Sequence, residues 1–414
     1  MANVLEYKCP NCAASLVWDG KTQKMKCNYC DSELDIEAIK QYDEILKVTE
    51  NERTNTWNTY NKSENWEGKE ELKDVKCDSC GGEILTDKNT IATECPYCGN
   101  PNIIYSQVSN ALCPDMVIPF KIQKNEAKEE LKKFYKKKPL LPKLFKKENR
   151  IDKITGIYVP FWLYDCNTKT NAIYNCKKAK TWRSGNIEYT KTDYYSLTRC
   201  CDMDFVKIPV DGSEKIDDIM MEAIEPFNYK DLVPFSMGYL SGFLADKYDV
   251  DAETNKPRVN ERIRNSIDSE IRNTMRGYTI EKQIVNVNIQ NGKIQYALMP
   301  IWLLNTKYKD KLYTFAMNGQ TGKFIGKLPI DKGKAFGYFI GISAVAFAIS
   351  VWFFTKLWVG TAMSLIAGGV SVGIMVNMMS NMRQQINASV YGKNFALTKS
   401  SDLFLYSRTT NKTI

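Results

Sequence analysis

Histidine is absent from this sequence of 414 residues. Imidazole is the side chain that most often serves as general base and metal ligand near neutral pH. Its absence excludes Ser-His-Asp and Cys-His catalysis and every histidine-ligated metal site. A zinc site here must be built from cysteine sulfur, with or without carboxylates. A Walker A motif and a G-x-G-x-x-G fingerprint are also missing. We therefore expect a protein that is not an enzyme.

The N-terminus, MANVLEYKCP, lacks the apolar segment and cleavage site of a signal peptide. Hydrophobic residues make up 43% of the chain and charged residues 25%, which is typical of folded domains and not of disordered or fibrous chains. Lys and Arg number 57 against 48 Asp and Glu, which gives a net charge of +9. These features predict a basic, cytosol-facing protein of several domains.

Eight of the thirteen cysteines form two copies of the pattern C-x2-C-x14-C-x2-C, offset by 68 positions. Two C-x-x-C turns present four thiolates to one ion. The fourteen residues between the two turns have the pattern of a strand, a turn and a second strand. The pattern predicts two zinc ribbons, each with one structural Zn²⁺; a redox pair or an iron–sulfur site is the alternative. The expected ligands are Cys9, Cys12, Cys27, Cys30, Cys77, Cys80, Cys95 and Cys98.

Four thiolates complete a tetrahedron, so neither ribbon keeps an open coordination position for catalysis. We interpret the ribbons as structural or binding modules. The other cysteines lack metal-ligand spacing, and we expect reduced thiols in a packed domain. They are Cys113, Cys166, Cys176, Cys200 and Cys201.

The overall prediction is an α+β multidomain protein. Its expected parts are a zinc ribbon (1–34), a charged helical linker (35–74), a second zinc ribbon (75–112), a central α+β domain (113–334), a transmembrane helical hairpin (335–382) and a cytosolic tail (383–414). The linker is expected to be solvated beyond a short amphipathic helix, which is suggested by Ile36, Ile39, Ile45 and Leu46. The tail alternates like a strand, so we expect it to dock on the central domain.

Within the central domain, apolar residues recur every fourth position and predict a helix over 260–275. Strands are expected over 283–289 and 293–304, joined by a hairpin at Asn291-Gly292. The segments 158–165 and 298–305 resemble each other, with their prolines and tryptophans 140 positions apart. We expect these two segments to form comparable strands of one domain.

The segment 124–153 holds twelve Lys and Arg against five Asp and Glu, a net charge of +7. Nucleic-acid phosphates and anionic lipid headgroups are both possible partners, and a solvated helix face is the third interpretation.

Residues 335–354 contain no charge, and neither do residues 357–382. About 20 apolar residues suffice to cross the hydrocarbon core of a bilayer, and one helix over both segments would be too long. Two transmembrane helices with a turn near residues 355–360 are therefore predicted, with a buried soluble helix pair as the alternative. Lysine and arginine flank the pair on its outer ends, which predicts that both termini of the chain lie in the cytosol.

Four features together indicate a resemblance to a known family. They are the duplicated ribbons, the segment Val159-Pro-Phe-Trp-Leu163, the loop Asn318–Lys323 and the pair of apolar segments near the C-terminus. The chain resembles bacterial membrane-anchored zinc-ribbon proteins, common in Firmicutes, that are labelled TFIIB-type zinc ribbon or primosomal-helicase-like. For one branch of that group, the resemblance implies a place in an envelope-stress membrane complex that recruits a phage-shock protein A homologue.

These observations favour a scaffold or adaptor in the cytoplasmic membrane that binds other proteins through its cytosolic part. The alternative is a zinc-ribbon nucleic-acid-binding protein tethered to the membrane. A thiol-dependent enzyme using Cys200 and Cys201 is a third hypothesis. No small-molecule substrate is indicated.

Overall fold

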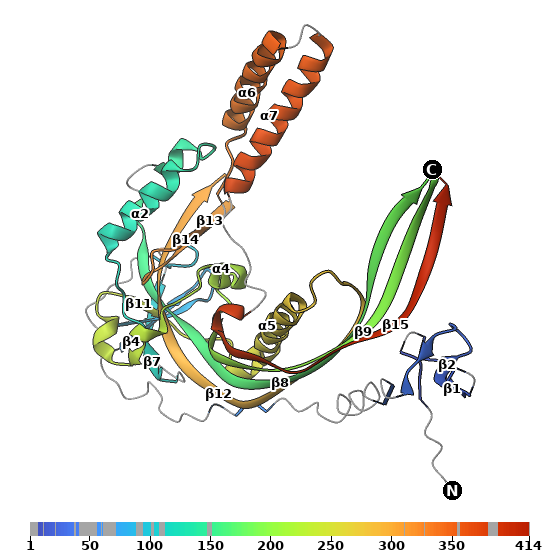
Figure 1. Ribbon diagram of the computed structural model, residues 1–414. Helices are drawn as coiled ribbons and strands as arrows, with labels where there is room; N and C mark the ends of the chain where they lie inside the picture. Colours follow the sequence, from blue (N-terminus) through green and yellow to red (C-terminus); the bar gives the residue numbers. More distant parts are fainter. Residues whose placement is uncertain are drawn as a thin grey trace.

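A computed structural model shows one large curved sheet, a small separate sheet near the N-terminus and a pair of projecting helices (Figure 1). The structure describes residues 7–10, 12–20, 22–36, 39–40, 56–58, 60, 72–87, 94–100, 103–106, 112–146, 151–309, 311–326, 328–353, 357–379 and 388–413. In these parts it is a strand-rich, mixed α/β protein.

Four long antiparallel strands in the order β12-β8-β9-β15 form the curved body of the sheet. Their bounds are β8 (Thr155–Ser184), β9 (Ile187–Asp211), β12 (Thr279–Tyr308) and β15 (Gly392–Thr413). The two similar segments lie directly side by side, with Pro160 opposite Leu298 and Tyr158 opposite Pro300. The prediction that they form comparable strands of one domain is therefore confirmed.

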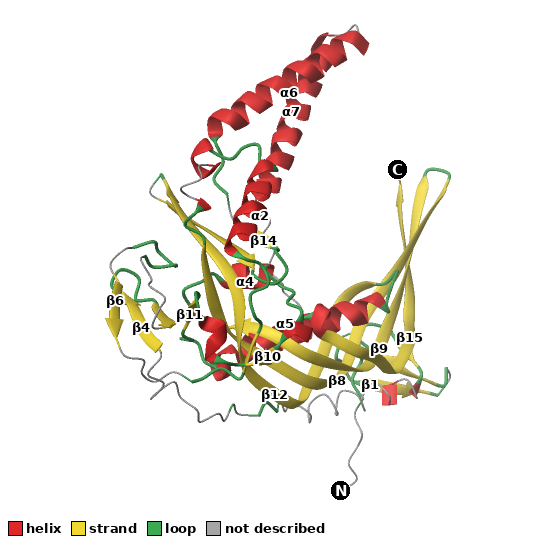
Figure 2. Ribbon diagram, turned by 90° about the vertical axis from the view of Figure 1, so that its left-hand side faces the viewer, coloured by secondary structure: helices red, strands yellow, loops and turns green. Residues whose placement is uncertain are grey.

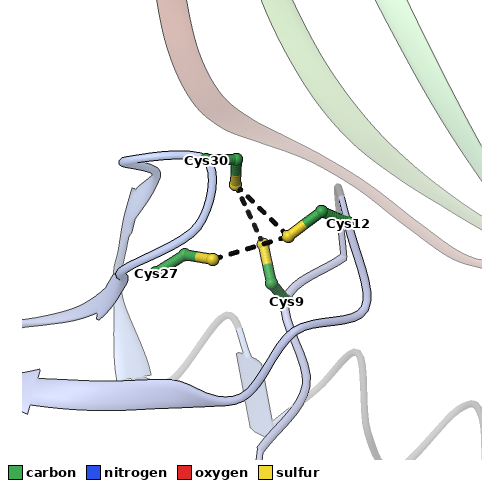
Figure 3. A group of neighbouring side chains, drawn as sticks. All are labelled: Cys9, Cys12, Cys27 and Cys30. Carbon is green, nitrogen blue, oxygen red and sulfur yellow. Dashed lines mark hydrogen bonds between the residues drawn. The ribbon is translucent and has the colours of Figure 1, made fainter.

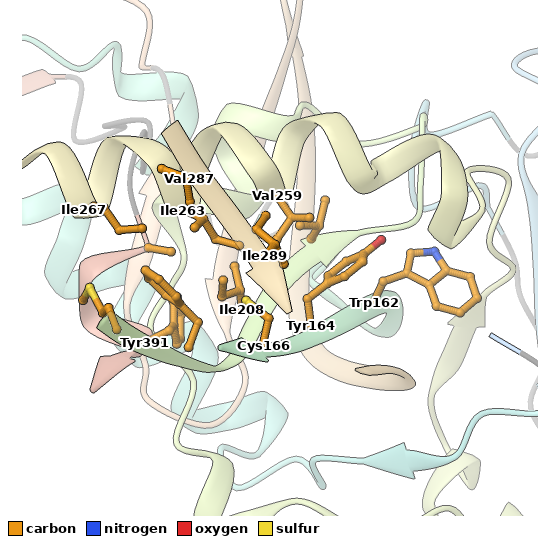
Figure 4. Packing of buried hydrophobic residues seen from close by; sticks show 14 of the residues in the cluster. Trp162, Tyr164, Cys166, Ile208, Val259, Ile263, Ile267, Val287, Ile289 and Tyr391 are labelled. Atoms are coloured by element: carbon orange, nitrogen blue, oxygen red, sulfur yellow. The ribbon is translucent and has the colours of Figure 1, made fainter. Parts of the chain in front are cut away.

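Helix α5 (Ala252–Asn273) lies in the concave side of the sheet (Figure 2). Asp251 caps its first turn, since its carboxylate accepts a hydrogen bond from the backbone N–H of Thr254 at 2.7 Å. The isoleucines at 263, 267 and 271 are fully buried, and Figure 4 shows the helix packed over β8 and β12. The predicted helix therefore exists, but it begins at Ala252 instead of Asn260.

Within the described residues, the rest of the large domain consists of short strands, two helices and four 3-10 turns. They are β4 (Leu72–Cys77), β5 (Glu83–Asp87), β6 (Ile103–Ser106), β7 (Met116–Val117), β10 (Val233–Pro234), β11 (Leu244–Asp246), β13 (Lys311–Asn318), β14 (Phe324–Gly326), α2 (Lys124–Lys136), α4 (Asp218–Ala223) and the 3-10 turns η1 (Lys143–Lys146), η2 (Tyr229–Asp231), η3 (Met237–Leu240) and η4 (Ser389–Tyr391). The small sheet consists of β1 (Leu16–Asp19), β2 (Lys24–Cys27) and β3 (Glu33–Leu34).

The prediction of a hairpin at Asn291-Gly292 is wrong. Strand β12 does not reverse there but continues along β8, with a β-bulge at these two residues. Asn291 has a φ of 53°, and the pairing with β8 shifts between Gln290 and Lys293. A Cβ on Gly292 would lie 2.4 Å from the ring of Trp57. Glycine is required here by a close approach of another segment and not by a reversal of the chain.

The segment around Trp57 belongs to the linker. The linker was expected to be solvated, but this part of it packs on the central sheet. The indole nitrogen of Trp57 donates to Asn260 Oδ1 at 2.9 Å, and its ring meets Tyr164 edge-on. The phenol of Tyr60 donates to Asp115 at 2.9 Å. Residues 56–58 and 60 are thus tied to the central sheet. The start of the expected linker helix is helical at residues 36 and 39–40, whereas its part around residues 45–46 lies outside the described residues.

The tail docks on the central domain as predicted, since β15 pairs with β9 from Gly392 to Thr413. Just before it, the hydroxyl of Tyr391 donates to buried Glu225 at 2.8 Å. Glu225 also pairs with buried Arg262 at 2.8 Å, which links the tail to α5.

Helices α6 (Lys332–Phe353) and α7 (Leu357–Met379) project from the body of the molecule beside each other (Figure 1). Gly368 of α7 lies against Phe339 and Ser343 of α6. In the described part of the chain, one helical segment is long and apolar enough to cross a membrane, namely 332–349 in α6, and none of it is buried. Helix α7 contributes a shorter apolar stretch, 364–374.

Candidate metal centres

The first four-cysteine group lies on the small sheet, where β2 ends at Cys27. The sulfur atoms of Cys9 and Cys30 are 3.6 Å apart, and that of Cys12 lies 3.5 Å from Cys27 and 3.6 Å from Cys30 (Figure 3). All four Sγ atoms lie within 4.8 Å of one another. The structure therefore brings together the four thiols that the spacing predicts.

The second group repeats this arrangement, with β4 ending at Cys77. The sulfur atoms of Cys77 and Cys98 are 3.7 Å apart, as are those of Cys80 and Cys95. The burial alternates in the same way as in the first group, since the first cysteine of each turn is buried and the second is half-buried. Each group could hold one metal ion.

A shared backbone turn positions each cysteine pair. The N–H of the residue after the second cysteine donates to the carbonyl of the first, for example Ala13 to Cys9 at 2.8 Å and Gly81 to Cys77 at 2.9 Å. These four closing residues all have a left-handed φ of 55–72°; they are Ala13, Asp31, Gly81 and Gly99. Such a turn points both thiols and the neighbouring N–H groups toward one centre.

The donor sets fit tetrahedral zinc. A Zn–S bond of about 2.3 Å places the sulfur atoms of a regular tetrahedron about 3.8 Å apart. The contacts of 3.5–3.7 Å in both groups lie slightly inside that value. Four thiolates with no other ligand are typical of closed structural sites and leave no position for a substrate.

The local environment makes one thiol in each group easier to ionise than its neighbour. Burial raises the pKa of Cys30, but the hydroxyl and N–H of Ser32 and the thiols of Cys27 and Cys12 together outweigh it and lower the pKa to about 7. The hydroxyl lies 3.0 Å from the sulfur. In the second group, burial is outweighed at Cys77 by backbone N–H groups that lower its pKa, whereas burial raises the pKa of Cys80. Ionised thiolate is the form that binds metal.

The two groups differ in their attachment to the rest of the molecule. The first ribbon packs on the outer end of the sheet against Tyr194, Leu405 and Tyr406. The second ribbon is continuous with the large sheet, because β5 pairs with β11 at Leu85 and Ala245. Its cysteines share a hydrophobic core with the first residues of β8 and the later part of β12.

Two asparagines of the central sheet hold the C-P-x-C turns. Asn175 of β8 donates its side-chain amide to the carbonyl of Pro10 at 2.9 Å. Asn305 of β12 donates to the carbonyls of Pro96 and Tyr97. Neither residue can be predicted from the sequence, since an asparagine far along the chain carries no signal of contact with a cysteine turn.

A groove of about 370 Å³ lies between the second ribbon and the end of the sheet. Its walls come from the Pro96-Tyr97 turn, from the start of α4 and from β13. A smaller cavity of about 150 Å³ adjoins it on the side of Cys95 and Cys98. The second metal centre therefore borders a concave surface, but its four thiols face one another and not the groove.

The remaining cysteines do not join either group. Cys166, Cys176 and Cys201 are buried in the long strands, and Cys200 is half-buried beside Cys201 on β9. Burial raises the pKa of Cys201 to about 11. A thiol of this kind is mostly protonated at neutral pH, so the structure gives no support to a reactive pair.

Comparison with known proteins yields one informative relationship. No family model matches the chain, and no solved structure matches it. The uncharacterized protein YdjG of Bacillus subtilis is 34% identical over 345 residues, which span 83% of this chain and 96% of the relative. This identity extends over nearly the whole relative and cannot come from the cysteine turns alone. The chain therefore belongs to the same protein family as the bacterial protein YdjG.

Proposed function

We propose that this protein is a membrane-anchored scaffold that binds other proteins at the cytosolic face of the bacterial cell membrane. The observation that carries the proposal is the exposure of α6. Its side chains at Phe336, Val345 and Ile349 are 54–64% exposed, although the helix is almost wholly apolar. An apolar helix without protein cover requires another apolar environment, and a bilayer supplies it.

The dimensions of the helix pair support the same proposal. Helix α6 has 22 residues and α7 has 23. At about 1.5 Å per residue each is roughly 33 Å long, close to a hydrocarbon thickness of about 30 Å. The pair would enter and leave the bilayer on the same side. Lys332 and Lys334 precede it and Arg383 and Lys393 follow it in the sequence, so the positive-inside rule favours cytosolic ribbons, sheet and tail.

In this proposal the two four-cysteine groups each hold one structural Zn²⁺, and the ribbons serve recognition. The first ribbon exposes an apolar surface on β1 and the Cys27–Cys30 turn. Its members are Val17 (52% exposed), Trp18 (45%) and Tyr29 (81%). Exposed aromatic side chains on a small rigid module are frequent in protein interfaces. A phage-shock protein A homologue is the first partner to test.

Two experiments test the proposal. Proteolysis of right-side-out and inverted vesicles should remove the sheet and ribbons only where the cytosolic face is accessible. Complete protection in inverted vesicles would contradict the proposed orientation. Recovery of the chain from the soluble fraction without detergent would contradict the anchor.

The scaffold itself is tested by affinity purification from membranes with Cys12→Ser and Cys98→Ser variants. Cys200→Ser is the matched control, since it changes a thiol outside both metal centres. We expect partner proteins to be lost with a ribbon variant and kept with the control. Recovery of no reproducible partner with the intact chain, or capture of nucleic acid instead of protein, would contradict the scaffold.

A further inference from the structure

Helix α2 and turn η1 carry a dense positive charge. Between Lys124 and Lys146 there are nine lysines and three glutamates and no other charged residue, a net charge of +6. We call the exposed lysines of this region the α2 lysine surface. They are Lys124, Lys132, Lys133, Lys136, Lys137 and Lys143.

The helix buries its apolar side chains and exposes a lysine-rich side. Ala127, Leu131 and Tyr135 are buried against the sheet. Lysines recur every four residues at 124, 128, 132 and 136, so they form one line beside that buried face. Glu126, Glu129 and Glu130 also lie outside the buried face, and Glu130 pairs with Lys133 at 2.6 Å. Lysines outnumber glutamates nine to three over residues 124–146, so the exposed side of this region carries a net positive charge.

The structure fixes this surface at the base of α6 (Figure 1). The backbone N–H of Asp331 donates to the carbonyl of Leu140 at 2.9 Å, and Lys334 Nζ donates to the carbonyl of Leu141. The rings of Phe134 and Phe324 are 4.8 Å apart, which joins α2 to β14 just ahead of α6. These contacts attach α2 and η1 to the start of α6.

We infer that the α2 lysine surface binds the anionic phospholipid headgroups of the membrane that holds α6, an inference that rests on the proposed membrane anchor. The attraction of a lysine to an anionic membrane decays over about 8 Å at physiological salt, so only a surface held next to the bilayer benefits. The hydrogen bonds from residues 331 and 334 hold α2 in that position.

A nucleic acid is the less favoured occupant. Single strands are usually held by aromatic side chains on which bases stack. Tyr135 is buried and Phe134 packs on Phe324, so α2 offers no free ring for stacking. The surface offers lysine charge alone, which suits a field of headgroup phosphates.

The test uses the intact chain in lipid nanodiscs. One preparation contains phosphatidylcholine only and the other contains phosphatidylcholine with phosphatidylglycerol. An amine-acylating reagent then labels accessible lysines, and mass spectrometry measures the label at each position. We expect Lys132, Lys136 and Lys143 to react about fivefold more slowly in the anionic discs, and this protection to disappear at about 1 M salt.

Internal references are available on the side of the molecule away from α6 and α7. Lys169 and Lys293 are exposed in the middle of β8 and β12, and Lys24 is exposed on β2 of the small sheet; these parts lie on that side (Figure 1). Their labelling should be the same in both kinds of disc. Retention of the chain in the discs is measured in the same samples and reports on the anchor separately.

Each result has a definite meaning. Equal labelling of the α2 lysine surface in both lipids, with the chain retained, would overturn the inference and leave the anchor standing. Loss of the chain from the discs would overturn both. Protection of the same lysines by short duplex DNA but not by anionic discs would assign the surface to nucleic acid instead.

Charge-reversal variants provide a second measurement. Replacing Lys132, Lys136 and Lys143 by glutamate should reduce the phosphatidylglycerol that copurifies with the chain in detergent by about threefold. The matched control replaces Lys24, Lys169 and Lys293 by glutamate and so changes the net charge equally. A similar loss in both variants would overturn the inference, because it would show an effect of total charge only.

Discussion

The side-chain amide of Asn175 donates a hydrogen bond to the carbonyl oxygen of Pro10, with 2.9 Å between nitrogen and oxygen. Asn305 makes the same kind of contact to Pro96 at the other ribbon. Each proline is the second residue of a C-P-x-C turn, although that turn comes first in one ribbon and last in the other. The same type of bond thus fastens both metal centres to neighbouring strands of one sheet.

We expect Asn305→Ala to loosen the second metal centre more than Asn175→Ala loosens the first. Asn305 donates to two carbonyls and accepts from Thr314 Oγ1 at 2.6 Å, whereas Asn175 has one bond to its ribbon. Leaving a part-buried carbonyl unpaired costs about 1–3 kcal/mol, so the rate of zinc release to a chelator should rise about tenfold in Asn305→Ala. Asn171→Ala on β8 is the control. An unchanged release rate in Asn305→Ala would show that the turn needs no support.

The left-handed turn residues allow a matched pair of substitutions. Ala13 has a φ of 62° and Gly81 a φ of 68°, and both close the same kind of turn. The left-handed conformation costs a residue with a Cβ about 1 kcal/mol, and no atom lies within 4 Å of a Cβ on Gly81. Ala13→Gly should therefore strengthen zinc binding by the first ribbon, and Gly81→Ala should weaken binding by the second. Competition titration with a fluorescent chelator measures both, and shifts of the same sign would contradict the argument.

The metal-binding groups could be predicted from sequence because their information is local. Four thiols at fixed spacing have few ways to reach one ion, and Figure 3 shows the arrangement that the spacing implies. The core face of α5 was predictable for the same reason, since the helical spacing of its apolar residues can be recognised within one continuous segment. The docking of the tail followed from the alternating pattern of its residues.

Features that depend on two distant segments could not be predicted in this way. Asn291-Gly292 carries the usual signal of a hairpin, yet Trp57 packs on Gly292 and β12 runs on. Trp57 and Tyr60 stand in a polar stretch that reads as solvated linker, and only the structure reveals Tyr164 and Trp162 as their partners. The asparagines that hold the ribbons belong to the same class of non-local contact.

Loss of a cysteine should have different consequences in the two ribbons. Cys77 lies in the same core as Val159 and Met299, whereas Cys9 lies in a small cluster of its own on the outer end of the sheet. We expect Cys77→Ser and Cys9→Ser each to lower the zinc content from two ions to one. Only Cys77→Ser should also lower the melting temperature of the central sheet, by about 2–4 °C for each kcal/mol lost. Equal melting temperatures for the two variants would contradict the shared core.

Because of Asp246, the free energy of unfolding should decrease as the pH rises from about 4 to about 7. Burial raises the pKa of this carboxyl group to about 7. The folded chain then retains a proton that the unfolded chain releases above about pH 4, so the unfolded state gains free energy as the pH rises through this window. Asp246→Asn should remove that loss, stabilising the protein at about pH 8 by up to about 4 kcal/mol and having little effect at about pH 4. Thermal unfolding at both pH values provides the measurement, with exposed Asp152→Asn as the control. A variant less stable than the parent at the higher pH would contradict the prediction.

The buried ion pair between Arg262 and Glu225 should control how firmly the chain is held where it returns from α7. The two side chains are each 3% exposed and form two hydrogen bonds of 2.8 and 3.1 Å. Tyr391 adds a third contact to the same carboxylate, at 2.8 Å. Removing the charge from one partner leaves the other buried without compensation, which costs about 3–5 kcal/mol.

We therefore expect Glu225→Gln to speed proteolysis near residue 388 by at least about tenfold and Tyr391→Phe to have a smaller effect, since the phenylalanine loses a single hydrogen bond. Glu253→Gln is the matched control, because Glu253 pairs with Lys256 at 2.5 Å with a carboxylate 53% exposed, and such surface pairs contribute little. Limited proteolysis in detergent, followed by mass spectrometry of the fragments, measures all three. If Glu225→Gln and Glu253→Gln were cut at the same rate, the tail would be held by the pairing of β15 with β9 alone, and the ion pair would have no part in fixing the end of α7 to the sheet.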